Sequence, residues 1–360
     1  MRIVHLIWTI TGGGAERQLA GLAPELARRG AEVHVAYVHQ GLGPQLRRWD
    51  GCAVTQIAPA VKYDLTLLPR VLLFARRLRP DVIQTWLAHM DVIGGTAAAL
   101  LRIPWVMSER SAAAAYPPAP LTSARVCLAR RAEVIVANSQ GGADYWRQHG
   151  IPSSRLEIVA NFVPEINLGS VALLHDARVS AGDELIVHLG RLSAEKNLET
   201  LIAAMALLRC RRPQVKLVLC GDGTLRRPLE EAVRAAGLEE RVVFAGFVAD
   251  VGPWLKRADA LVAVSRFEGH PNSVLEAIAH GVPLVLSDIP AYRAMLGDDA
   301  AVFVPLTNAE ALAGAIAATL EARACAQQRA ARARAAPAAL SLEAMATRYE
   351  QVYRRVMRSA

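Results

Sequence analysis

Short runs of apolar residues alternate along the chain with longer segments in which apolar side chains recur every three or four positions. The short runs are rich in Val, Ile and Leu, which is typical of strands buried on both faces of a parallel sheet. The longer segments have the period of helices that would cover those faces. The strands predicted in the first half are 3–8, 33–38, 54–57, 82–85, 105–107 and 134–137. The helices predicted between them are 18–29, 44–49, 69–78, 92–100 and 122–132.

The alternation weakens between residues 161 and 180, where Pro164, Gly169 and mixed polar residues favour a linker, and then begins again. The strands predicted in the second half are 185–189, 216–220, 242–244, 260–264, 282–287 and 301–304. Helices are predicted at 198–208 and 226–236, with a short one closed by Gly281. A capping box at Thr307 and Glu310 opens a helix that runs to about Arg334, and after a break at Pro337 residues 341–357 form a terminal helix.

A chain of 360 residues exceeds what one hydrophobic core usually organises. We therefore predict an α/β protein of two doubly wound, Rossmann-like domains that face each other across a cleft. The predicted segments are an N-terminal domain at 1–165, a linker at 166–180, a C-terminal domain at 181–340, and a terminal helix at 341–360 that folds back on the first domain. In such sheets ligands bind beyond the carboxyl ends of the strands.

The net charge of +8 is concentrated in the first domain, where residues 1–165 hold 18 Lys and Arg against 12 Asp and Glu. Basic helical segments at 70–79 and 125–131 account for much of this excess. One interpretation is peripheral contact with an anionic membrane, and the other is a solvated helix face. Nucleic-acid binding is not predicted, because no basic run has interleaved aromatic residues.

The five cysteines are scattered, with no C-x-x-C pair, which predicts reduced thiols and a cytoplasmic protein. No apolar run reaches the ~18 residues that cross a bilayer. The chain has no H-x-x-x-H or D-x-D motif, so we expect neither a metal site nor a bound cofactor.

Three loops at predicted strand ends could bind a diphosphate. The first contains Gly12, Gly13 and Gly14 before a helix, where backbone N–H groups and the helix dipole favour an anion. It lacks the third glycine of a dinucleotide fingerprint, since Arg17 takes that place, but a dinucleotide-dependent oxidoreductase or epimerase stays an alternative. A tight turn that needs glycine is the structural alternative.

The second loop follows the strand at 185–189 and contains Arg191 and Lys196 just before a helix. Fixed cations can stabilise the charge that develops on a diphosphate leaving group without a metal. The alternative is a surface loop with two solvated charges.

The third loop, at 265–276, holds two carboxylates eight residues apart. Glu268 could contact sugar hydroxyls and Glu276 the ribose, while the N–H groups of Asn272, Ser273 and Val274 offer an anion site. Alternatively, Ser273 and Glu276 form only a capping box.

Five motifs occur in an order and spacing that resemble glycosyltransferase family 4, the retaining, nucleotide-sugar-dependent enzymes of the two-Rossmann, glycosyltransferase-B architecture. They are Gly13-Gly14-Ala15-Glu16; Gly190-Arg191-Leu192 with Lys196 and Asn197; Gly221-Asp222-Gly223; Phe244 with Gly246; and Glu268 with Glu276. The resemblance covers nearly the whole chain, and its C-terminal half carries the specific motifs.

The resemblance implies roles for these residues. Arg191 and Lys196 would bind the donor diphosphate, Glu268 the donor sugar and Glu276 the ribose. The loop with Gly13 and Gly14 would close over the phosphates. The backbone of Gly246, Phe247 and Val248 would meet the nucleobase.

In the first domain, the stretch from Asp81 to His89 resembles the family's D-V-x6-H motif, which would place His89 beside the reacting sugar. Glu109 and Arg110, at the next strand end, would help to bind the acceptor. The chain departs from the family at its entry to the second domain, where only Asn161 of the P-N-G motif is present, and at His270, where an apolar residue is usual.

The resemblance therefore implies a metal-independent retaining glycosyltransferase with a nucleoside-diphosphate-sugar donor, UDP being favoured over GDP. The acceptor would be a glycan or a lipid-linked glycan of a cell-surface polysaccharide, lipopolysaccharide or glycolipid. The enzyme would be cytoplasmic and could contact the inner face of the membrane. A non-catalytic sugar-nucleotide-binding protein on the same fold is the remaining alternative.

Overall fold

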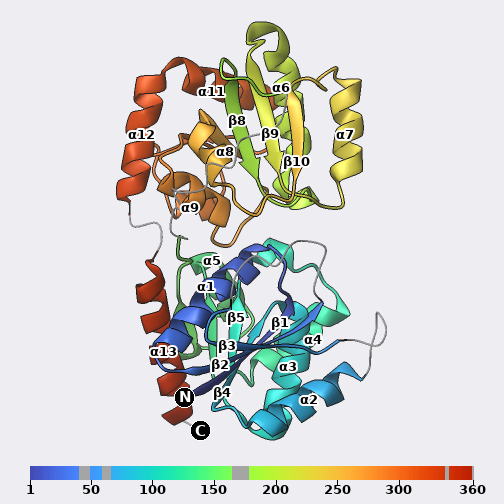
Figure 1. Cartoon of the computed structure of the whole chain (residues 1–360), viewed down its shortest axis with the longest axis vertical. Coiled ribbons are helices and arrows are strands. Elements are labelled where there is room, and N and C mark those ends of the chain that lie inside the picture. Colours follow the sequence, from blue (N-terminus) through green and yellow to red (C-terminus); the bar gives the residue numbers. More distant parts are fainter. Residues whose placement is uncertain (40–48, 59–65, 164–177, 337–339, 359–360) are drawn as a thin grey trace. The chain divides into compact units, whose positions relative to one another are not determined.

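The computed structural model describes residues 1–39, 49–58, 66–163, 178–336 and 340–358 (Figure 1). The chain divides into two compact units, the first formed by Met1–Phe162 with Ala339–Ala360 and the second by Val163–Ala338. Residues 44–48 of the helix predicted at 44–49, most of the linker predicted at 166–180, and Pro337 lie outside the described residues.

Unit 1 contains a seven-stranded parallel sheet of order β3-β2-β1-β4-β5-β6-β7. Its strands are β1 (Arg2–Thr9), β2 (Glu32–His39), β3 (Cys52–Gln56), β4 (Val82–Trp86), β5 (Trp105–Glu109), β6 (Val134–Ala137) and β7 (Leu156–Ile158). Its helices are α1 (Gly14–Arg28), α2 (Leu67–Leu78), α3 (Ala88–Leu101), α4 (Pro120–Ala129), α5 (Gln140–Gln148) and α13 (Leu342–Arg358). Alternate residues of β1 enter two cores: Ile3 and Ile7 pack with α1 and α13, while Val4 and Leu6 pack with α2 and α3.

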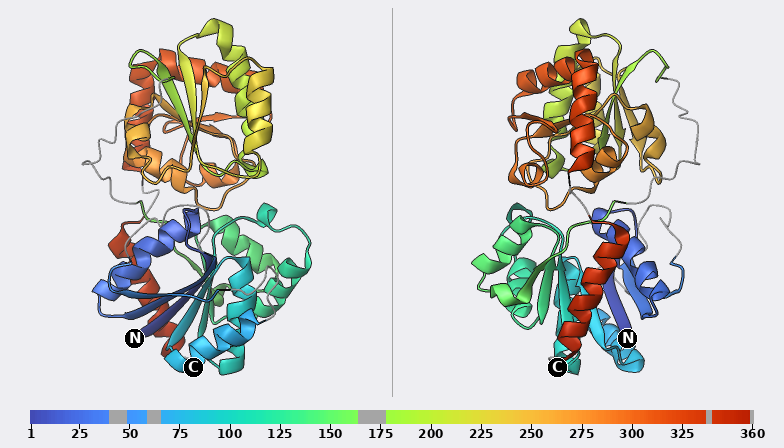
Figure 2. Two further views of the ribbon diagram at one scale, coloured as in Figure 1. Left: turned by 45° about the vertical axis from the view of Figure 1, so that its right-hand side comes forward. Right: turned by 90° about the vertical axis from the view of Figure 1, so that its left-hand side faces the viewer.

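The terminal helix α13 belongs to unit 1 and lies against α1, as Figure 2 shows. Tyr349 and Tyr353 are fully buried, and the Tyr353 hydroxyl donates to the side-chain carbonyl of Gln84 in β4. Arg29 donates from the end of α1 to the backbone oxygen of Glu343, at 2.8 Å. The chain therefore completes the core of its first unit with its last helix.

Unit 2 contains a six-stranded parallel sheet of order β10-β9-β8-β11-β12-β13. Its strands are β8 (Glu184–Leu189), β9 (Val215–Cys220), β10 (Val242–Gly246), β11 (Ala260–Ala263), β12 (Leu284–Ser287) and β13 (Val302–Val304). Its α-helices are α6 (Leu198–Arg211), α7 (Arg226–Ala235), α8 (Gly252–Arg257), α9 (Asn272–Ala279), α10 (Pro290–Arg293), α11 (Ala309–Glu321) and α12 (Arg323–Ala335). Helices α6, α7 and α11 cover one face, while α8, α9 and α12 supply the core of the other.

Both sheets reverse their strand order beside the first strand, between β1 and β4 in unit 1 and between β8 and β11 in unit 2. This confirms the predicted fold class of two doubly wound α/β domains. The predicted strands all form, with ends within two residues of those expected. The sequence pattern missed β7, α5, α8 and α10, which are short or have few apolar positions.

The structure differs from several of the helix predictions. The segment predicted as one helix from Thr307 is two helices, because the backbone at Ala322 leaves the helical region with φ −90° and ψ 55°. The cap of α11 is Asn308, whose Oδ1 accepts from the backbone N–H of Ala311 at 2.8 Å. Helix α1 starts at Gly14, so the glycine loop runs directly into it.

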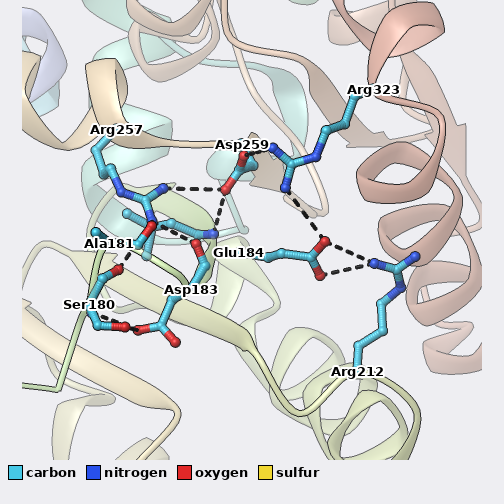
Figure 3. A network of polar contacts seen from close by, with 9 residues as sticks. Ser180, Ala181, Asp183, Glu184, Arg212, Arg257, Asp259 and Arg323 are labelled. Carbon is cyan, nitrogen blue, oxygen red and sulfur yellow. Dashed lines mark hydrogen bonds and ion pairs between the residues drawn. The ribbon is translucent and has the colours of Figure 1, made fainter.

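An ion-pair network fastens the amino ends of β8 and β11 to the surrounding helices (Figure 3). Glu184 is 11% exposed and accepts from Arg212, the C-cap residue of α6, at 2.9 Å and 3.0 Å, with Arg323 of α12 at 3.6 Å. Arg323 also pairs with Asp259 at 3.2 Å, and Arg257 pairs with the same carboxylate at 3.4 Å. The network lies at the opposite end of the strands from the loops predicted to bind ligand.

We expect Glu184→Ala to lower the free energy of unfolding of unit 2 by about 2 kcal/mol, because it leaves Arg212 without its largely buried partner. The measurement is urea unfolding followed by the fluorescence of Trp254, the one tryptophan between residues 163 and 338. The control is Glu231→Ala, which breaks an exposed pair with Arg227 and should cost less than about 0.5 kcal/mol. Equal effects would contradict a special role for the network.

Candidate functional site

The candidate site of unit 2 lies at the carboxyl ends of β8 and β11, where the strand order reverses. After β8 the chain forms an extended turn and a 3-10 helix, η3 (Ala194–Lys196). After β11 it forms a loop that ends in α9. The second and third loops selected from the sequence are therefore adjacent in space.

An ion pair joins these two loops. The Nζ atom of Lys196 lies 2.5 Å from Oε1 of Glu268, and the two side chains are only 17% and 14% exposed. Glu268 also accepts from the hydroxyl of buried Ser265 at 2.7 Å. The residue predicted to bind the diphosphate and the one predicted to bind the sugar thus contact each other directly.

Backbone and side-chain hydrogen bonds fix the same two loops. The backbone N–H of Arg266 donates to the carbonyl of Glu195, and its guanidinium to Oδ1 of Asn197, each at 2.7 Å. Asn197 has a left-handed backbone (φ 53°), and its Nδ2 donates to the carbonyl of Leu306 at 2.7 Å. Arg191, in contrast, is exposed. Lys196 is therefore held in place, while Arg191 projects into solvent.

The loop after β9, with Gly221, Asp222 and Gly223, supports the loop after β8. The N–H of Leu192 donates to the carbonyl of Asp222 at 3.0 Å. A Cβ atom on Gly221 would lie 1.9 Å from the carbonyl oxygen of Gly190, and one on Gly223 would lie 2.4 Å from that of Leu192. The two glycines are needed because backbone packs on backbone here.

Helix α9 begins at Asn272, with Pro271 as its N-cap residue. Ser273 therefore lies inside the first turn, and the alternative prediction of a capping box with Ser273 at the N-cap is wrong. Glu276 is buried at 5% exposure. Val274 has its side chain in the core, so only its backbone could face a ligand.

The segment predicted to meet the nucleobase follows β10. Gly246 has a positive φ of 68°, and its carbonyl accepts from the N–H of Gly221 at 2.7 Å. Phe247 is exposed and Val248 partly buried. The segment predicted to meet the nucleobase is thus hydrogen-bonded to the same glycine loop that supports the loop after β8.

In unit 1 the glycine loop follows β1. Gly12 has φ 62°, Gly13 is the N-cap residue of α1, and Gly14 is exposed. A Cβ atom on Gly13 would lie 2.2 Å from the carboxylate of Glu16, which accepts from the Thr9 hydroxyl at 2.6 Å. A side chain at Gly13 would therefore displace the Glu16 carboxylate from its position under the loop.

His89 lies in the first turn of α3 at the end of β4. Leu87, which precedes that helix, has φ 73° and ψ 149°, a strained conformation for a non-glycine residue. The His89 ring stacks on Trp8 with 4.5 Å between centroids, and His39 packs against the edge of Trp8 at 5.0 Å. Burial, and then the nearby His39, lower the pKa of His89. Sequence reasoning missed Trp8 and His39, although their positions at strand ends could have indicated them.

Glu109 and Arg110 lie in the interior of unit 1. Glu109 is fully buried, accepts from the Trp146 indole at 2.9 Å and pairs with Arg125 at 3.0 Å. Arg110 lies 5.2 Å above the Trp86 ring and donates to Oδ1 of Asn161 at 2.5 Å. Their predicted acceptor role stays a prediction, and a buried carboxylate such as Glu109 could act only through its neighbours.

Among the described residues, no three His, Cys, Asp or Glu side chains come together as a set of metal ligands. Within the same ranges, none of the helices has the length and apolar character required to span a bilayer.

We expect Gly223→Ala to disrupt the loop after β8, since the new methyl group would overlap the backbone of Leu192. Overpacking of this kind costs about 1–3 kcal/mol, which should be measurable by thermal unfolding. The control is Gly182→Ala, where a Cβ atom would meet nothing within 4 Å. A melting temperature as high as that of the control would contradict the close packing.

The sequence matches two family profiles, "Glycosyltransferase Family 4" over residues 12–165 and "Glycosyl transferases group 1" over residues 183–322. It is 30% identical to the lipopolysaccharide core biosynthesis glycosyltransferase LpsE of Rhizobium meliloti over 88% of each chain. It is 27% identical to N-acetylgalactosamine-N,N'-diacetylbacillosaminyl-diphospho-undecaprenol 4-alpha-N-acetylgalactosaminyltransferase of Campylobacter jejuni, over 81% of this chain and 82% of that protein.

Solved structures share the fold. The Anabaena protein Alr3699/HepE, crystallised with UDP and glucose, superposes with a TM-score of 0.86 at 23% identity, over 99% of this chain and 100% of that one. Sucrose-phosphate synthase of Thermosynechococcus elongatus superposes with a TM-score of 0.78 at 20% identity, over the full length of both chains. The profile matches, the identity to LpsE and the expected motifs lead to one conclusion: the chain belongs to glycosyltransferase family 4.

Proposed function

We propose that the protein transfers a sugar from UDP-sugar to a glycan or lipid-linked acceptor, with retention of the anomeric configuration and without a metal ion. The observation that carries this proposal is the Lys196–Glu268 pair at the reversal of strand order in unit 2. It places a cation for a diphosphate beside a carboxylate for a sugar, which are the two charges that a nucleotide-sugar donor requires.

In this proposal Lys196 and Arg191 bind the donor diphosphate and stabilise the charge on the departing nucleotide. Glu268 accepts hydrogen bonds from donor-sugar hydroxyls, and Glu276 from the ribose. The N–H groups at the start of α9 add positive potential near the phosphates. In the free protein the ammonium of Lys196 donates to Glu268. When the donor binds, the same ammonium has to hydrogen-bond both this carboxylate and a phosphate oxygen.

The relatives support the class of substrate. HepE has been crystallised with UDP and with UDP-glucose, which supports UDP as the nucleotide. LpsE is named for lipopolysaccharide core synthesis, and the Campylobacter enzyme for a diphospho-undecaprenol acceptor. Family membership overturns the alternative of a dinucleotide-dependent oxidoreductase or epimerase. Retention is proposed from the resemblance to the family.

A membrane-contact face on unit 1 is part of the proposal. Leu73 is 50% exposed on α2, on the same side as Arg76 and Arg77. Leu100, at the end of the adjoining helix α3, is 64% exposed. Apolar side chains among arginines suit the headgroup region of an anionic membrane.

We expect Lys196→Met to weaken UDP binding about 10- to 100-fold, since a charge-assisted hydrogen bond to a phosphate contributes about 1.5–3 kcal/mol. Titration calorimetry with UDP measures it. The control is Lys256→Met, which removes an exposed lysine of α8 and should bind UDP like the wild type. A Lys196→Met protein that binds UDP as tightly as that control would overturn the proposed diphosphate site.

For Glu268 we expect a loss of turnover and not a loss of UDP affinity. Glu268→Gln should lower turnover with UDP-glucose at least about 10-fold while it changes UDP affinity little, because UDP lacks the sugar that Glu268 contacts. Steady-state kinetics and calorimetry on the same preparation separate these effects. Wild-type turnover by Glu268→Gln would contradict its role at the sugar.

Contact with membranes should depend on the arginines of α2. We expect Arg76→Gln with Arg77→Gln to lower the binding constant for anionic liposomes, measured by flotation, by up to about 30-fold, at about 1 kcal/mol for each arginine near the surface. The control pair is Arg332→Gln with Arg334→Gln, which removes the same charge from exposed positions of α12 in unit 2. Equal binding by both double variants would contradict a membrane face on α2.

A further inference from the structure

His188 is a buried polar residue beneath the candidate donor site, and the proposed function leaves it without a role. It is the fifth residue of β8 and lies two positions before Gly190. Its side chain is 1% exposed, on a strand whose other side chains from Leu185 to Leu189 are apolar and buried.

One ring nitrogen of His188 has a fixed role. Nδ1 lies 3.0 Å from the backbone carbonyl oxygen of Val262, in the adjacent strand β11. A carbonyl oxygen only accepts hydrogen bonds, so Nδ1 carries the hydrogen of the neutral ring and Nε2 carries a lone pair. Burial lowers the pKa of His188 to about 4, with the charge of Lys196 acting in the same direction, so the ring is neutral near pH 7.

The lone pair of Nε2 has no hydrogen-bond partner among the described residues. It faces the space beside Gly190, where a Cβ atom would lie 3.2 Å from Nε2 and 3.3 Å from Cε of Lys196. The histidine ring and the lysine stem therefore border the same small space, which exists because residue 190 has no side chain.

A buried acceptor without a partner costs about 1–3 kcal/mol, whereas an apolar side chain of similar size would pack in the same place at no such cost. A purely structural account of His188 explains the bond to Val262 but leaves Nε2 unexplained. The neighbouring ammonium of Lys196 is the donor that could use it.

We propose that His188 is a positioning residue for Lys196, whose ammonium donates to Nε2 when a nucleoside diphosphate occupies the site. This rests on the proposed function of Lys196. An ammonium has three N–H donors, of which Glu268 takes one in the free protein. With diphosphate bound, a phosphate oxygen and Nε2 take the other two. A neutral acceptor holds the lysine without adding a negative charge beside the phosphates.

The test compares two substitutions. In His188→Asn the amide N–H can still donate to Val262, but no acceptor reaches the position of Nε2. In His188→Gln the longer side chain can place its carbonyl oxygen there. We expect His188→Asn to weaken UDP binding about 10-fold in titration calorimetry, and His188→Gln to bind within about threefold of the wild type.

A double-mutant cycle separates positioning from packing. If His188 acts through the ammonium, His188→Asn should have no further effect on UDP binding in a Lys196→Met background. A loss of the same size in both backgrounds, or no loss in the wild-type background, would overturn the proposal and leave the proposed function standing. A wild-type protein that does not bind UDP would overturn both.

A measurement on the wild type does not depend on the folding of a His188 variant. The 15N chemical shift of His188 Nε2 should change when UDP is added to the wild-type protein and should stay unchanged when UDP is added at saturating concentration to Lys196→Met. A resonance that does not respond in the wild type, or that responds equally in both proteins, would contradict a hydrogen bond from Lys196.

Discussion

The ion pair between Lys196 and Glu268 joins two loops that are 72 residues apart in sequence, and much of unit 2 serves to hold those loops together. Both side chains are more than four-fifths buried, so their charges interact in a medium less polar than water. Ser265 holds the carboxylate from one side. The pair thus places a cation and a carboxylate side by side at one strand end, where each neutralises the charge of the other.

Close packing of one backbone segment against another supports the loops that hold this pair. The loop after β8 rests on Gly221 and Gly223, and the backbone N–H of Gly221 donates to the carbonyl of Gly246 at the end of β10. A side chain at Gly221 or Gly223 would overlap backbone atoms of the loop after β8. Three strand ends are therefore coupled through main-chain contacts, which vary less with side-chain motion than contacts between long side chains do.

In unit 1, different contacts hold the residues at the carboxyl ends of the strands. Its glycine loop folds over the buried carboxylate of Glu16, and His89 is held by stacking on Trp8 after a strained residue, Leu87. Below them, Arg125 pairs with Asp91 and Glu109 inside the core, and burial raises the pKa of Asp91 to about 6. Buried charges that are mutually paired fix side-chain geometry, and breaking one pair leaves an uncompensated charge.

The sequence by itself determined the strands except the short β7, the doubly wound class and the residues of the three loops. Apolar runs such as those of β1 and β8 are local signals, and the glycine and charge motifs have fixed spacing. Only the tertiary structure decided that Lys196 contacts Glu268 and that Nε2 of His188 faces the lysine stem. The same holds for the stacking of the His89 ring on Trp8. The physical reason is that these contacts depend on which strands are neighbours. The order of strands across a sheet is set by the packing of the whole domain, whereas periodicity reports only which face of each element is buried.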